Sequence, residues 1–174
     1  MTYHYTSQYT RRLTVDGLKN WAGQWPVSHN LVAVTLSTNW DKTNKYRNEN
    51  NVPAAMQSLK NFDYRVNKLC FGRKSCLVAD KRQYGFATIE HPKSNIHWHC
   101  ILSIRNFKVY EYSELAKIAW NQVCPSGSLD VQEIYNFKGW AKYISKDAYR
   151  VDLDSIETFY PIPDLAWNST PLSL

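Results

Sequence analysis

The sequence predicts an α+β domain with a central, largely antiparallel β-sheet flanked by helices. Three observations lead to this prediction: a β-rich run at 31–37, a helical pattern at 52–71, and two strand-like runs, 85–91 and 96–105, joined by a hairpin-length loop. The 174 residues are enough for one core of ordinary size. Short connections between successive strands favour antiparallel pairing.

The elements are predicted one by one from local patterns. Residues 31–37 read LVAVTLS, which is typical of a buried strand. Between 52 and 71 the apolar residues recur at steps of three and four, with Asn51 as a possible N-cap and Pro53 in the first turn. Three further helices are expected, at 15–22, at 113–123 and at 136–149, with Ser113 as the cap of the second. Besides the hairpin, strands are expected at 75–80 and 129–135.

Charge divides the chain into two parts. The formal net charge is +6, but residues 151–174 contain four acidic residues and no Lys or Arg, which leaves residues 1–150 at +10. A basic body, in a chain with 14% aromatic residues, favours single-stranded nucleic acid as a partner, although a merely solvated cationic surface is the alternative. We expect one domain over 1–150, with 1–30 as an extension packed on it, and a Pro-containing acidic strap or linker over 151–174 that contributes nothing chemical.

Several classes of protein are not expected. No stretch approaches the roughly 20 apolar residues that span a bilayer, and the N-terminus lacks the features of a secretory signal, so we expect an intracellular protein with no membrane partner. The four cysteines, Cys70, Cys76, Cys100 and Cys124, include no C-x-x-C pair and are expected to be reduced thiols. The run 72–75 lacks the spacing of a P-loop, so ATP hydrolysis is not predicted.

A candidate metal site lies in the predicted hairpin. Side chains alternate along a strand, so His97 and His99 point to the same face. If residues 92–95 form the loop, Glu90 lies opposite His97 and therefore beside both imidazoles, whereas His91 points away. A register shifted by one residue would exchange Glu90 and His91. Two imidazoles and a carboxylate favour Mg²⁺ or Mn²⁺ in function, although the same ligands can hold Zn²⁺ or Ni²⁺.

A candidate nucleophile lies on the last predicted helix. Tyr143 and Lys146 are three residues apart and share a helix face. A phenol has a pKa of about 10, so it attacks phosphorus efficiently only when a cation stabilises the phenolate or a base removes its proton. Lys146 can supply that charge. Taken alone, the pair is also compatible with a half-buried aromatic beside a solvated lysine.

The order of these motifs resembles the rolling-circle replication initiators (Rep proteins) of the HUH endonuclease superfamily. In that family a strand with a T-L core, here Thr35 and Leu36, precedes a carboxylate and H-x-H, and Y-x-x-K follows. The resemblance covers about residues 31–149. It implies an RRM-like nuclease fold, a divalent cation held by Glu90, His97 and His99, and covalent attachment of DNA to Tyr143 with support from Lys146.

The resemblance further implies that the enzyme nicks a single-stranded replication origin and rejoins it through a 5′-phosphotyrosine link. One tyrosine rather than a pair suggests the single-tyrosine class. A host or fused helicase is an expected partner. The expected compartment is the cytoplasm for a plasmid or phage and the nucleus for a eukaryotic virus. Two other functions stay open: a transposase or mobilisation relaxase of the same superfamily, and a non-catalytic module that binds single strands through its aromatic residues.

Overall fold

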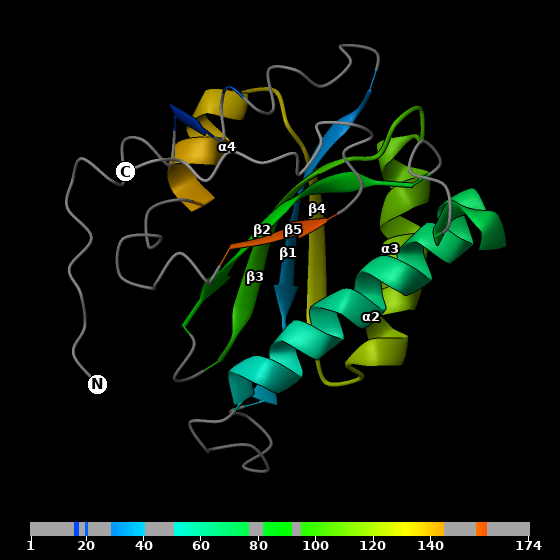
Figure 1. Ribbon diagram of the computed structural model, residues 1–174, viewed down its shortest axis with the longest axis vertical. Coiled ribbons are helices and arrows are strands. Elements are labelled where there is room, and N and C mark those ends of the chain that lie inside the picture. Colours follow the sequence, from blue (N-terminus) through cyan, green and yellow to red (C-terminus); the bar gives the residue numbers. More distant parts are fainter. Residues whose placement is uncertain are drawn as a thin grey trace, which may run out of the picture.

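The computed structural model describes residues 16–17, 20, 29–40, 51–76, 82–91, 95–144 and 156–159 (Figure 1). Its elements follow the order β1 (Leu31–Ser37), α2 (Asn51–Phe71), a short 3-10 helix (Arg73–Cys76), β2 (Tyr84–Glu90), β3 (His97–Ser103), α3 (Val109–Val123), β4 (Ser128–Glu133), α4 (Phe137–Ile144) and β5 (Ile156–Phe159). The predicted α+β class with an antiparallel sheet is confirmed.

The sheet has five strands in the order β4-β1-β3-β2-β5, and each neighbouring pair is antiparallel. The strand with the two histidines, β3, therefore lies in the middle of the sheet. Residues that face one another across β1, β3 and β2 form rows, one of which contains Thr35, His99 and Thr88. The next row contains Ser37, His97 and Glu90, so the rows set which polar side chains meet.

Helices cover the sheet unequally on its two faces. On one face α2 and α3 lie side by side over the larger core, which includes Trp98, Trp120, Tyr112 and Phe62, all fully buried or nearly so. The opposite face carries the rows with the histidines, and a smaller cluster around Phe86 includes the partly buried Trp140 of α4. Figure 1 shows α4 apart from the α2–α3 pair. The histidine face is thus only partly covered by the described helices.

The helix boundaries differ from the predicted ones in an instructive way. α2 matches the predicted helix to within one residue and ends at Phe71. Gly72 follows it with a φ of 83°, the left-handed conformation that suits a glycine after a helix. α3 begins at Val109 rather than near Ser113, and Lys108 precedes it with no side-chain cap. Ser113 as a cap was therefore wrong. Burial of Tyr112 in the first turns stabilises the earlier start.

Other segments correct or limit the predictions. The strand predicted at 75–80 is wrong at its start, where a 3-10 helix ends at Cys76, and residues 77–80 lie outside the described part. Of the helix predicted at 15–22 only positions 16, 17 and 20 are described, and these are helical. β5, which the sequence did not predict, adds to the edge of the sheet beside β2. Among the described helices, none is long and apolar enough to cross a membrane.

Candidate functional site

The predicted hairpin register is confirmed. Glu90 lies opposite His97, and Thr88 lies opposite His99. Trp98, between the two histidines, points into the larger core and is fully buried. The alternation that a pleated strand imposes therefore brings Glu90, His97 and His99 to one face, as the sequence indicated.

His99 is the centre of the cluster. Its Nε2 donates a hydrogen bond of 2.6 Å to Oε2 of Glu90, and its Nδ1 is 3.2 Å from the hydroxyl of Thr35 on β1. Only 7% of the residue is exposed. The ring is consequently held from both nitrogens, by a carboxylate on one side and by a hydroxyl on the other.

His97 is held less tightly. Nδ2 of Asn95 lies 3.5 Å from its Nε2, while its Nδ1 is buried and makes no hydrogen bond of normal geometry with the described residues. Burial lowers the pKa of His97, and the backbone of Asn95 opposes part of that effect. The neutral imidazole, which is the form that donates a lone pair to a metal, is therefore favoured.

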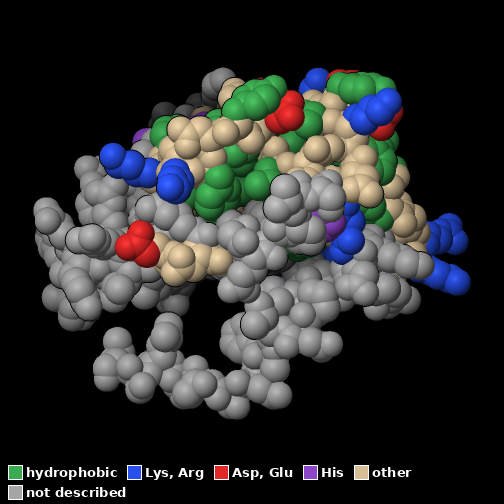
Figure 2. All heavy atoms as spheres, turned by 90° about the horizontal axis from the view of Figure 1, so that it is seen from above, with side chains coloured by type: hydrophobic (Ala, Val, Ile, Leu, Met, Phe, Trp, Pro, Cys, Tyr) green, Lys and Arg blue, Asp and Glu red, His purple; other side chains and the backbone are tan. Residues whose placement is uncertain are grey.

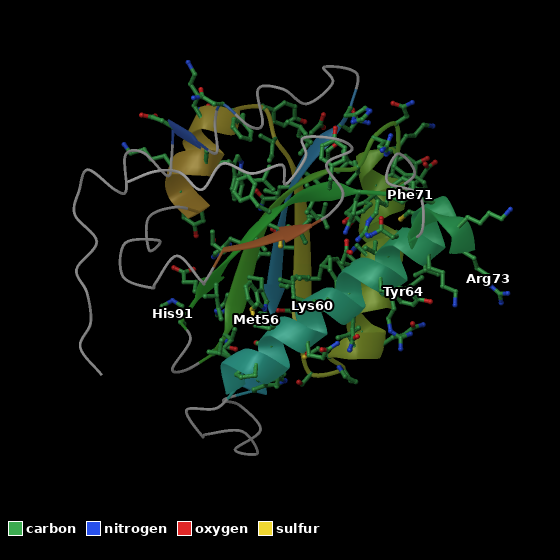
Figure 3. The ribbon with its side chains drawn as sticks, viewed as in Figure 1. Met56, Lys60, Tyr64, Phe71, Arg73 and His91 are labelled. Carbon is green, nitrogen blue, oxygen red and sulfur yellow. The ribbon has the colours of Figure 1, made fainter. Side chains whose placement is uncertain are left out.

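The expectation that His91 points away from the site was wrong, although the register behind it was right. His91 has a φ of 54°, so it leaves the strand in the left-handed conformation and turns back. Its Nε2 is 3.8 Å from Oε1 of Glu90, and its ring centroid is 5.8 Å from that of His97. Figure 3 shows His91 at the end of β2. Its side chain is 59% exposed, in contrast to the buried His99.

The candidate nucleophile lies against His99. α4 places the ring of Tyr143 edge-on to that of His99, with centroids 5.3 Å apart and planes at 80°. Trp140, one turn earlier, makes a similar contact with Tyr143 at 5.6 Å. Tyr143 is 44% exposed. Two motifs that are 44 residues apart in the sequence, at positions 99 and 143, thus meet on one face of the sheet.

The predicted partner of the tyrosine lies outside the described residues. α4 is described to Ile144, so Lys146 and also Tyr149 are not placed. Lys138 and Lys142 are exposed on the described part of α4. Figure 2 shows Lys and Arg side chains spread over the visible surface rather than gathered in one patch.

The donor set fits a divalent cation in chemistry but is not preassembled. Among the described residues no three His, Cys, Asp or Glu side chains form a ready metal-binding group. Glu90 and His99 are instead joined directly by a hydrogen bond. Nδ1 of His97 makes no hydrogen bond of normal geometry with the described residues, and the carboxylate of Glu90 lies between His91 and His99. Both are nevertheless the kinds of group that an ion would satisfy.

Sequence reasoning missed two members of the cluster. Thr35 was noted only as part of a strand motif, and the alternation of β1 could have placed it on the histidine face. Asn95 was assigned to the loop, yet its side chain links Ser37, at 3.5 Å from the serine hydroxyl, to His97. No sequence pattern specifies such a loop contact.

The three cysteine thiols that the structure describes stand apart from this cluster. Cys70, Cys100 and Cys124 are free, and Cys100 and Cys124 are buried in the larger core. Burial raises the pKa of Cys70 to about 12, which makes its thiol unreactive near neutral pH.

Comparison of the chain with protein-family models, with curated proteins and with solved structures finds no match.

Proposed function

We propose that this protein is a metal-dependent endonuclease and strand transferase that nicks single-stranded DNA at a replication origin through Tyr143. The observation that supports the proposal most is the contact between Tyr143 and His99, with His99 in turn bonded to Glu90. A nucleophile and a set of metal-type ligands on separate elements meet at one place. A surface that only binds DNA does not need this juxtaposition.

Glu90, His97 and His99 would hold Mg²⁺ or Mn²⁺. When bound, the cation supplies positive charge that stabilises the scissile phosphate as it is attacked. Neutral His97 is already in the form needed for ligation, because burial lowers its pKa. The hydrogen bond between Glu90 and His99 keeps these two groups adjacent in the free protein.

The phenol oxygen of Tyr143 forms the new bond to phosphorus and gives up its proton, and the bond from phosphorus to the 3′ oxygen breaks. The 3′ oxygen takes up a proton and leaves as a hydroxyl, while the 5′ side stays on the tyrosine. The phosphotyrosyl ester is still a phosphodiester, so a later 3′-hydroxyl can displace Tyr143 and rejoin a strand. Partial exposure of Tyr143 leaves the phenol accessible to DNA. Lys146 is proposed to stabilise the phenolate.

The test uses a pool of single-stranded oligonucleotides of randomised sequence with Mn²⁺. We expect the wild type to form a protein–DNA band that survives denaturation, and Tyr143→Phe to form none. The variant should keep its fold and its Mn²⁺ affinity, because the ligands lie on β2 and β3 rather than on α4. Lys146→Ala should slow the reaction without abolishing it, since charge supports the step but does not form the bond.

Trp140→Phe is a matched control on the same helix, because it alters an aromatic neighbour of Tyr143 but removes no hydroxyl. A Tyr143→Phe variant that still forms the band would show that another residue is the nucleophile. A wild type that binds the pool without forming any band would favour the non-catalytic binding module. Sequencing the DNA attached to Tyr143 then shows whether cleavage recurs at one origin-type site.

A further inference from the structure

A hydroxyl on β1 forms a hydrogen bond with His99, which contacts both the carboxylate of Glu90 and the ring of Tyr143. Thr35 lies directly opposite His99 in the β1–β3 register, and its Oγ1 is 3.2 Å from Nδ1 of that ring. The β-branched threonine has few accessible rotamers, so the backbone pairing also determines where the hydroxyl lies. The bond is therefore built into the sheet and does not depend on a loop.

The chemistry of an imidazole makes the position of this hydroxyl important. A neutral ring carries one proton, and if Nε2 binds a cation the proton must reside on Nδ1. In the structure Nε2 faces Glu90, which leaves Nδ1 to Thr35. A hydroxyl can either donate or accept, so it can satisfy Nδ1 both when Nε2 donates to Glu90 and when Nε2 binds a cation. An aliphatic side chain can do neither.

We propose that Thr35 is a positioning residue that holds the ring of His99 against Tyr143 and accepts the Nδ1 proton when Nε2 binds a cation. This inference rests on the proposed function for the identity of the ligand. The inference adds a role for the strand motif that contains Thr35 and Leu36. Partners of this kind typically change metal affinity by about 10- to 100-fold when they are removed.

The test compares Thr35→Val, Thr35→Ser and Thr38→Val with the wild type by calorimetric titration of Mn²⁺. Thr38 is a matched control: its hydroxyl is also buried at the end of β1, but it donates to the backbone carbonyl of Ile96 rather than to an imidazole. We expect Thr35→Val to lose about 10- to 100-fold in affinity. Thr35→Ser should restore most of it, and Thr38→Val should change it little.

A second measurement locates the ring proton of His99 in the wild type, so it does not depend on whether the variants fold. Nitrogen-15 NMR of histidine-labelled protein with Zn²⁺, which is diamagnetic, should show the proton of His99 on Nδ1. Unchanged Mn²⁺ affinity in folded Thr35→Val, failure of serine to restore it, or a Zn²⁺-bound His99 with no proton on Nδ1 would each overturn the inference. A wild type that binds Mn²⁺ in this way but forms no covalent DNA adduct would refute the proposed nuclease and leave the role of Thr35 intact.

Discussion

Two polar clusters of the described residues, one beneath α2 and α3 and one on the opposite face of the sheet, are completed in different ways. Beneath the helices, Asp63 accepts from Asn67 at 2.7 Å and from Gln83 at 3.0 Å, and Tyr112 donates to Gln83 at 2.6 Å. Arg82 forms an ion pair with the same carboxylate. These side chains bond one another within the fold, although Nε of Arg82 is buried without a hydrogen-bond partner among the described residues.

The cluster around His99 is left open. His97 retains a buried Nδ1 without a hydrogen bond of normal geometry among the described residues, and both Tyr143 and His91 are substantially exposed. A buried polar group without a partner costs free energy, and the fold tolerates that cost most readily where a ligand supplies the missing contact. The comparison teaches that polarity and burial alone do not identify a functional site. Incomplete bonding beside an exposed tyrosine, here Tyr143, is the more useful criterion.

The largest expected effect is on Mn²⁺ affinity, and it comes from removing the carboxylate of the cluster around His99. Glu90→Ala takes away the carboxylate that lies between His91 and His99, so Mn²⁺ affinity should fall by more than the about 10- to 100-fold typical of losing an outer partner. Calorimetric titration measures it. His91→Ala should cost less, because that side chain is exposed and farther from the carboxylate than His99 is. A larger loss in His91→Ala would move the metal toward the exposed end of the hairpin.

Substitutions in the cluster around Asp63 should instead change the stability of the fold. Tyr112→Phe removes a buried hydroxyl and leaves Oε1 of Gln83 without this donor, which should cost about 1–3 kcal/mol of unfolding free energy. Tyr110→Phe is the matched control, because its hydroxyl bonds Glu111 at the exposed surface and should matter by less than about 0.5 kcal/mol. Denaturant unfolding measures both. If Tyr112→Phe lowered the binding free energy of Mn²⁺ by as much as the unfolding free energy, the two faces of the sheet would be coupled.

Much of the open cluster could be predicted from the sequence because strand geometry is periodic. Alternation in β3 and a short loop were sufficient to place Glu90 opposite His97. The same reasoning failed at His91, where a single left-handed residue ends the strand and redirects the side chain. Backbone conformation at a non-glycine residue has no reliable sequence pattern, so the error was physical and local.

The contacts between distant elements could not be predicted in the same way. The sequence indicated that Tyr143 and the histidines belong to one type of site, but the ring contact with His99 depends on how α4 packs against Phe86 and Ile101. The early start of α3 and the edge strand β5 likewise depend on tertiary burial and pairing rather than on local residue preference. The role expected for residues 151–174 stays a prediction.

The smallest expected effect concerns a third group of polar side chains, which lies on the histidine face but is closed. His29 bonds the hydroxyl of Tyr84 at 2.8 Å and that of Ser103 at 3.0 Å through Nδ1. Burial, with a contribution from the charge of Arg105, lowers the pKa of His29 below its usual value of 6.5. As pH falls through that value, the unfolded chain takes up the proton before the folded protein does, so the folded state loses stability.

We therefore expect the unfolding free energy of the wild type to be highest above about pH 6.5 and to decline as the pH is lowered below it. His29→Gln should show a shallower decline, because the substituted side chain keeps polar contacts to Tyr84 and Ser103 but does not titrate. Burial also lowers the pKa of His97, so part of the decline should persist in the variant. Denaturant unfolding at a series of pH values measures the slopes. Equal slopes in wild type and variant would show that His29 does not contribute to the pH dependence of the unfolding free energy.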